Sequence, residues 1–206
     1  LGQVPRATAR DGRVLACKLQ YPDMASAVEA DLKQLQLLFS LHRRMSPAID
    51  TREIAQEISA RVREELDYAR EAAHIAMYRR ILEDADEIRV PDVIDELSTG
   101  RLLTMGWLTG KPLLDYKDHG QEERNLLART MFHAWWHPFS HFGVIHGDPH
   151  LGNYTVFETD GAPAGINLLD YGCIRVFPEA FVEGVVELYR GLLEEDNDRV
   201  VAAYER

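Results

Sequence analysis

Two short polar segments in the C-terminal half of the chain contain side chains that could catalyse phosphoryl transfer. The first is His146-Gly147-Asp148-Pro149-His150-Leu151-Gly152-Asn153, and the second, after an expected strand hairpin, is Asp170-Tyr171-Gly172. Phosphoryl transfer needs metal ions across the phosphates and a carboxylate that orients the attacking group. Asp148 could orient or deprotonate the acceptor, while Asn153 and Asp170 could hold Mg²⁺. Either segment alone is ordinary loop sequence, but both in this order match the catalytic-loop and metal-loop signatures of kinase-type enzymes.

A lysine on an expected strand and a glutamate on an expected helix could complete such a site. In kinase-type enzymes this ion pair holds the α- and β-phosphates of the nucleotide. Lys18 lies in the apolar run 14–20, and Glu65 falls within the apolar stripe of a regular helix over residues 51–81. A carboxylate in a core-facing stripe is costly unless it is paired, so Glu65 is the predicted partner of Lys18. Alternatively, Glu65 lies in a solvated groove and Lys18 extends into solvent.

Three histidines repeat at four-residue spacing and raise the question of a metal site. His133, His137 and His141 would align as ligands on an unbroken helix. Pro138 is expected to interrupt the register, and no glutamate follows His133 as in the zinc-binding His-Glu-x-x-His pattern. Packing beside neighbouring tryptophans is the simpler explanation for the three. His146 differs, because it precedes Asp148 at catalytic-loop spacing, and its predicted role is structural.

Apolar periodicity and turn residues predict the elements that must position these side chains. Asp11-Gly12 between two short β-type runs indicates a hairpin. Strands are expected at residues 14–20, 88–94, 101–108, 154–157 and 166–169. Helices are expected after Pro22 to about residue 44, over 51–81, over 121–142 with a bend or early end at Pro138, and over 178–193.

Composition narrows the classes of function. The formal net charge is −11 and the basic residues form no continuous block, so binding to nucleic acid is not expected. Cys17 and Cys173 cannot form a disulfide framework or a Cys-x-x-Cys pair, which favours a reducing compartment. No apolar run is long enough to span a membrane and no signal peptide is visible. The sequence begins abruptly and stops in what resembles an unfinished helix, so we expect it to be part of a longer protein.

With these residues identified, the chain resembles the UbiB-like atypical kinases. Residues 14–22 resemble the lysine strand of that family, and Glu64-Glu65-Leu66-Asp67-Tyr68-Ala69-Arg70-Glu71-Ala72 resembles its Glu-Leu-Asp helix motif. The loops at residues 146–153 and 170–172 complete the match. The resemblance covers nearly the whole chain.

The resemblance implies an α+β, two-lobed protein kinase-like fold, truncated at both ends. Residues 1–110 would form the N-lobe, with the lysine strand, the Glu-Leu-Asp helix and the hinge. Residues 111–206 would form a partial C-lobe with the catalytic and metal loops. Gly2 and Gln3 would end an Ala-rich nucleotide loop, and Met105 would lie in the hinge that contacts adenine through backbone groups.

The same resemblance implies ATP and Mg²⁺ as cofactors and an ATPase or unorthodox kinase activity. That activity would support isoprenoid-quinone (ubiquinone-type) biosynthesis. Quinone-pathway proteins or lipids at a membrane surface would be the partners besides ATP. The expected location is cytoplasmic, at the periphery of a membrane.

Two other functions remain open. Small-molecule phosphotransferases of the aminoglycoside or choline kinase type also use a His-Gly-Asp loop that ends in Asn, followed by a metal-binding Asp. Gly147, where UbiB-like proteins usually have Ala, slightly favours this class, whereas Glu64-Glu65-Leu66-Asp67 argues against it. The other alternative is a scaffold without catalysis, in which bound ATP changes the partners of the protein.

Overall fold

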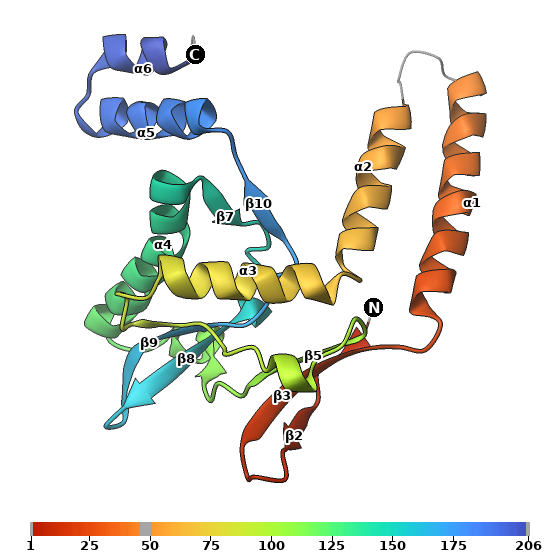
Figure 1. Cartoon of the computed structure of the whole chain (residues 1–206). Helices are drawn as coiled ribbons and strands as arrows, with labels where there is room; N and C mark the ends of the chain where they lie inside the picture. The colour runs from red at the N-terminus through yellow and green to blue at the C-terminus, as the bar shows by residue number, and fades with distance from the viewer. Residues whose placement is uncertain (1, 46–50, 205–206) are drawn as a thin grey trace. The chain divides into compact units, whose positions relative to one another are not determined.

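The computed structural model describes residues 2–45 and 51–204, which fall into two compact units (Figure 1). The first unit comprises residues up to 74 together with 92–107, and the second comprises 75–91 together with 108–206. The lobes expected from the sequence place residues 75–91 in the first part instead. Each unit has its own sheet and its own buried residues, and each is described separately.

The sheet of the first unit is built around strand β3, which carries Lys18. Its strands are β1 (Gly2–Gln3), β2 (Arg6–Thr8), β3 (Val14–Gln20) and β5 (Leu102–Gly106). All pairings are antiparallel, with β1 and β2 end to end along one edge of β3 and β5 along the other. The hairpin predicted around Asp11-Gly12 is confirmed, and Gly12 there adopts a positive φ of 89°, which favours glycine.

The helices of the first unit differ in one respect from the prediction. They are α1 (Met24–Met45), α2 (Thr51–Glu64) and the first half of α3 (Tyr68–Ile81), with a short 3₁₀ turn, η1 (Asp95–Leu97). Helices α1 and α2 pack side by side as an antiparallel pair (Figure 1). The single helix expected over 51–81 is wrong, because residues 65–67 interrupt it and separate α2 from α3.

The second unit contains a four-stranded sheet and a separate two-stranded one. The larger sheet has the order β4-β9-β8-β6, and β7 pairs antiparallel with β10. The strands are β4 (Ile88–Arg89), β6 (Lys111–Pro112), β7 (Val144–His146), β8 (Tyr154–Thr159), β9 (Ala162–Leu168) and β10 (Ile174–Val176). The hairpin predicted from residues 154–169 is confirmed as β8–β9. The strand expected over 88–94 is largely wrong, since only Ile88–Arg89 forms a strand, parallel to β9.

Of the helices in the second unit, α4 (Gln121–Phe142) packs against the strands, α5 (Glu179–Leu193) packs against α4, and α6 (Asn197–Tyr204) packs against α5. The unit also has two 3₁₀ turns, η2 (Leu113–Tyr116) and η3 (Leu151–Asn153). Helix α4 packs against β9 and β7 and buries Leu127 and Ala134. Trp135 of α4 donates from its indole nitrogen to the hydroxyl of Tyr154 at 3.0 Å, which ties the helix to β8.

Helix α4 continues through its proline. The expectation that Pro138 ends it early is wrong, because the helix runs on to Phe142, while a bend at Pro138 stays a prediction. A proline removes one amide donor from the helix, and only the last turn lies beyond it here. That turn is closed by Gly143, whose left-handed conformation (φ 67°) lets its amide donate to Phe139 O at 2.9 Å.

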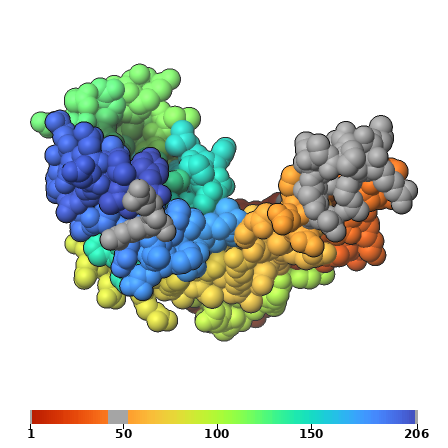
Figure 2. All heavy atoms as spheres, turned by 90° about the horizontal axis from the view of Figure 1, so that it is seen from above, coloured from red at the N-terminus to blue at the C-terminus, as the bar shows by residue number. Residues whose placement is uncertain are grey.

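Helices α5 and α6 lie side by side and form one face of the second unit (blue in Figure 2). Exposed large apolar side chains on them include Phe181, Leu192, Leu193, Val201 and Tyr204. Among residues 2–45 and 51–204, none of the helices combines the length and apolar character that a membrane span requires.

The closure of α4 yields a stability prediction. We expect Gly143→Ala to lower the free energy of unfolding by about 2–3 kcal/mol, since a left-handed alanine costs about 1–2 kcal/mol and adds a crowded Cβ. That Cβ would lie 2.9 Å from Phe177 O. Gly161→Ala is the matched control, because φ is +82° there but the Cβ would meet no atom within 4 Å. Urea unfolding measures both variants, and equal losses would contradict the steric part of the argument.

Candidate active site

The two polar loops are brought together first by the β8–β9 hairpin. Asn153 immediately precedes β8, and Asp170 follows β9 by two residues. Because the strands are antiparallel, with Tyr154 opposite Leu168, their ends lie side by side. Leu169 N donates to Asn153 O at 3.0 Å and extends this pairing by one bond. The hairpin therefore positions both predicted metal ligands at one end of the same sheet.

The second pairing, between β7 and β10, places the Asp148 loop beside the residues that follow Asp170. His146 lies opposite Ile174, and Gly147 N donates to Cys173 O at 2.6 Å. A Cβ at Gly147 would lie only 2.7 Å from that same oxygen. Glycine therefore permits the close backbone contact that joins the two loops.

His146 connects the two loops through both of its ring nitrogens. Its Nε2 donates to the backbone oxygen of Asp170, and its Nδ1 accepts from Asp148 N at 3.4 Å. The side chain is buried, with 1% of its surface exposed. Three tyrosine rings pack around the imidazole, those of Tyr78, Tyr154 and Tyr171. These contacts give His146 the structural role expected from the sequence.

Asp148 is held as an anion. Its Oδ2 accepts from Asn153 Nδ2 at 2.8 Å, and its Oδ1 accepts from His150 N at 3.1 Å. Partial burial by itself would raise the pKa of Asp148, but these two hydrogen bonds outweigh it and lower the pKa below the usual value. The carboxylate is therefore ionised at neutral pH, the form that can orient a hydroxyl group or accept its proton.

Asn153 and Asp170 supply oxygen donors of the kind that Mg²⁺ prefers. The amide nitrogen of Asn153 points to Asp148, so its Oδ1 faces away from that carboxylate. Asp170 Oδ1 accepts from Gly172 N at 2.9 Å, which fixes the direction of the carboxylate. Within the described ranges, no three His, Cys, Asp or Glu side chains gather as a metal cage. One carboxylate and one amide oxygen fit Mg²⁺ that also binds phosphate and water.

In the first unit, Lys18 pairs with Glu71. The Nζ atom of Lys18 lies 2.7 Å and 2.9 Å from the two carboxylate oxygens of Glu71. The exposed fractions of the two side chains are 17% and 3%, respectively. The predicted pairing of Lys18 with Glu65 is therefore wrong, and Glu65 is exposed.

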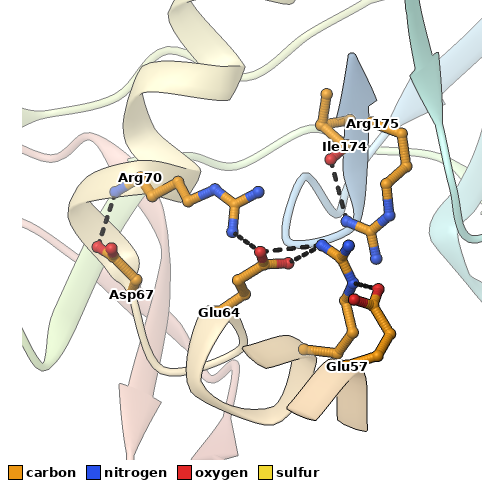
Figure 3. Close-up of polar contacts among 7 residues, drawn as sticks. Glu57, Glu64, Asp67, Arg70, Ile174 and Arg175 are labelled. Atoms are coloured by element: carbon orange, nitrogen blue, oxygen red, sulfur yellow. Dashed lines mark hydrogen bonds and ion pairs between the residues drawn. The ribbon is translucent and has the colours of Figure 1, made fainter. Parts of the chain in front are cut away.

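The break between α2 and α3 explains this difference. At Leu66 and Asp67 the backbone amides donate three residues back, as in a tight turn, and α2 ends. Asp67 then caps α3, since its Oδ1 accepts from Arg70 N at 2.9 Å (Figure 3). The apolar stripe expected for one continuous helix over residues 51–81 therefore does not give the direction of the side chains after the break. The restarted helix places Glu71 in its first turn, where the helix dipole also favours a negative charge.

Glu64 joins the two helices across the break. Its carboxylate accepts from Arg61 Nη1 at 2.9 Å and 2.7 Å and forms an ion pair with Arg70 Nη1 at 2.7 Å (Figure 3). Partial burial alone would raise the pKa of Glu64, but the two guanidinium groups lower it overall. Glu64 thus carries its charge near neutral pH and holds the end of α2 against the start of α3.

The same face of β3 contacts the residues after the break. Lys18 and Gln20 are two positions apart and so point to one side of the strand. Gln20 donates from its side-chain amide to Leu66 O at 2.6 Å. The ammonium group of Lys18 also lies 5.8 Å from the centre of the Tyr68 ring. β3 therefore contacts both the turn and the first turn of α3.

The other predicted nucleotide contacts lie in the same sheet. Gly2 and Gln3 form β1, and a Cβ at Gly2 would meet Leu19 O at 2.1 Å, so the approach to β3 requires glycine. Met105 is buried in β5 with 4% of its surface exposed. The contacts of Gly2, Gln3 and Met105 with a nucleotide stay predictions.

Comparison with known proteins identifies the family. Residues 1–204 match the ABC1 atypical kinase-like domain. The chain belongs to this family. The match confirms the resemblance to UbiB-like atypical kinases.

Individual relatives extend well beyond the matched region. The mitochondrial atypical kinase COQ8B of Rattus norvegicus is 29% identical over 201 residues, which cover 98% of this chain and 38% of that protein. The chloroplastic Protein ACTIVITY OF BC1 COMPLEX KINASE 8 of Arabidopsis thaliana is 27% identical over 210 residues, covering 98% and 27%, respectively. The chain therefore spans well under half the length of these curated relatives.

A solved structure supports the fold. The Rv3197–erythromycin complex from Mycobacterium tuberculosis superimposes with a TM-score of 0.79 at 28% identity. The superposition covers 99% of this chain and 51% of that one. Together with the family match, it confirms the predicted α+β, protein kinase-like fold.

The corrected ion pair gives a second prediction. We expect Glu71→Gln to lower the free energy of unfolding by about 3 kcal/mol, near the low end for buried pairs because Lys18 keeps some exposure. Glu65→Gln is the control and should change it by no more than about 0.5 kcal/mol, as surface substitutions do. Urea unfolding compares the two. Adding Lys18→Met to Glu71→Gln should recover part of the loss, and equal losses in the single variants would contradict the pairing.

Proposed function

We propose that this chain is the nucleotide-binding core of an ATP- and Mg²⁺-dependent atypical kinase or ATPase of the UbiB type. The observation that carries the proposal is the convergence of Asp148, Asn153 and Asp170 where β8, β9, β7 and β10 meet. Phosphoryl transfer asks little of a protein besides placed charges, a metal site and a carboxylate. The donor set described above meets those requirements.

Each of the three residues has a role in this proposal. Asp148, ionised and held by Asn153, orients the acceptor hydroxyl or water and receives its proton. Asn153 and Asp170 would hold Mg²⁺ through oxygen atoms. When it is bound, this ion would neutralise negative charge on the phosphates. His146 keeps the two loops in register through its two ring nitrogens.

In the first unit, Lys18 is the residue proposed to bind the α- and β-phosphates. Its partner Glu71 holds the ammonium group in one position, which is the contribution first assigned to Glu65. Backbone groups near Met105 are proposed to contact adenine, and Gly2 and Gln3 to contact the phosphates. The family resemblance supports these assignments.

The proposed biological role is support of isoprenoid-quinone, ubiquinone-type biosynthesis. The curated relatives are named as kinases of mitochondria and chloroplasts. By the family resemblance, quinone-pathway proteins or lipids at a membrane surface are the proposed partners, with the protein at the membrane periphery.

Turnover of ATP tests the catalytic part of the proposal. In the protein that contains this chain, we expect Asp148→Asn to lower Mg²⁺-dependent ATP turnover by about 100-fold or more, as loss of a positioned base does. Asp170→Asn should weaken the dependence on Mg²⁺ and lower turnover similarly. Asp160→Asn is the control, because this residue lies in the turn at the opposite end of β8–β9. Phosphate release measures all three.

These variants, together with analysis of the products formed from ATP in the presence of candidate alcohols, separate the alternatives. Unchanged turnover in both Asp148→Asn and Asp170→Asn would indicate a nucleotide-binding scaffold instead of an enzyme. Stoichiometric phosphorylation of an aminoglycoside or of choline would indicate a small-molecule phosphotransferase.

Quinone content tests the proposed pathway. Deleting the gene in its own host should lower isoprenoid-quinone content, because the activity supports that synthesis. The wild-type protein should restore the content, and the Asp148→Asn variant, expressed at the same level, should not. Quinone content is measured by chromatography of lipid extracts. Normal content in the deletion strain, with ATP turnover intact in vitro, would refute the pathway while leaving the kinase core in place.

A further inference from the structure

Helix α4 carries a row of three imidazoles that the proposed phosphoryl transfer does not use. His133, His137 and His141 lie at four-residue intervals on one face, because the helix is unbroken at Pro138. The ring centres of His133 and His137 are 5.3 Å apart, and those of His137 and His141 are 4.4 Å apart. The alignment that Pro138 was expected to prevent is therefore present.

Each ring directs one nitrogen to an oxygen of the protein. His133 Nδ1 lies 2.8 Å from Glu87 Oε1, and His141 Nδ1 lies 3.2 Å from His137 O. His137 hydrogen-bonds to the backbone of Ile81. A neutral imidazole that donates one N–H to oxygen presents a lone pair on its other nitrogen. Metal-binding histidines are oriented in this way by the groups around the metal.

We propose that His137 and His141 bind a divalent transition-metal ion of the zinc, nickel or copper class. Imidazole nitrogen suits these ions, whereas Mg²⁺ and Ca²⁺ prefer oxygen ligands. Two nitrogens that share one zinc ion lie no more than about 4 Å apart, since each Zn–N bond is about 2.0–2.1 Å. Rings with centres 4.4 Å apart can present one nitrogen each within that distance.

The protein supplies two ligands and water completes the coordination. In the part of the chain that the structure describes, no cluster of three or more metal-capable side chains is assembled. His133, whose ring is farther from that of His137, makes a weaker contribution. The pair His137–His141 is therefore the centre of the proposed site.

The surroundings of His141 favour a cation. His141 lines a cavity of about 680 Å³ whose wall also contains Glu179, Glu183 and Glu187 and one guanidinium group, that of Arg190. Glu187 is paired with Arg190 and Arg199, whereas Glu179 and Glu183 add negative charge to the wall, which raises the local concentration of cations.

Titration of the untagged protein with ZnCl₂ tests the proposal. We expect one zinc ion per chain with an affinity that falls at least tenfold in His137→Ala and in His141→Ala, and less in His133→Ala. His141 is exposed, so its replacement leaves the fold intact. His119→Ala is the matched control, an exposed histidine just before α4 that should leave the affinity unchanged. Competition with a chromogenic chelator measures the affinity, and circular dichroism checks folding.

A second variant separates this site from the phosphate-binding residues. Asp170→Asn should retain the full zinc affinity, because the proposed ligands lie on α4 alone. In ¹⁵N-labelled protein, zinc should shift the ring signals of His137 and His141. Equal zinc affinity in the wild type and in the His137→Ala/His141→Ala double variant would overturn the proposal. Loss of the bound zinc in Asp170→Asn would overturn it as well.

Discussion

The arrangement of the first unit depends on the burial of one charge. Glu71 is almost fully enclosed, and an unpaired carboxylate there would be costly, so the first turn of α3 must lie where Lys18 of β3 can reach it. Three local interactions secure that position. Asp67 caps α3, Glu64 bridges Arg61 and Arg70 across the break, and Gln20 bonds to the turn. The segment that the sequence predicts to be part of one helix therefore contains a turn, and this turn places the carboxylate of Glu71 beside Lys18.

The parts predicted correctly from sequence are those whose geometry is local. Asn153 and Asp170 lie side by side because a hairpin joins neighbouring segments, and the apolar runs that form β8 and β9 are visible in the sequence. Asp148 reaches them through the pairing of β7 with β10, a longer-range contact that the sequence did not predict. The partner of Lys18 could not be found by helical periodicity, because that calculation assumes an unbroken helix. A signal was present in Asp67, a strong N-cap residue three positions before Arg70. If the second helix is taken to begin after Asp67, its predicted apolar face lies closer to Glu71.

Two other features of the structure differ from the sequence-based prediction for the same kind of reason. In each, a long-range or cooperative effect outweighs a local preference. Only Ile88 and Arg89 form a strand in the segment expected to be one, since the chain then leaves β9 and Val93 forms an isolated bridge with Met105 of β5. Pro138 does not end α4, because it removes one donor while the last turn is closed by Gly143 and packed against the sheet. Local propensity predicted an interruption, and tertiary packing overrode it.

The identity of His146 follows from the hydrogen bonds of the two loops. The loop of Asp148 presents a backbone N–H to it, and the segment of Asp170 presents a backbone carbonyl. A buried group between them must therefore accept on one side and donate on the other. A neutral imidazole does both with a rigid ring, and its flat faces also pack against tyrosine. Together with the bond from Gly147 N to Cys173 O, this side chain joins the two loops at both backbone and side-chain level.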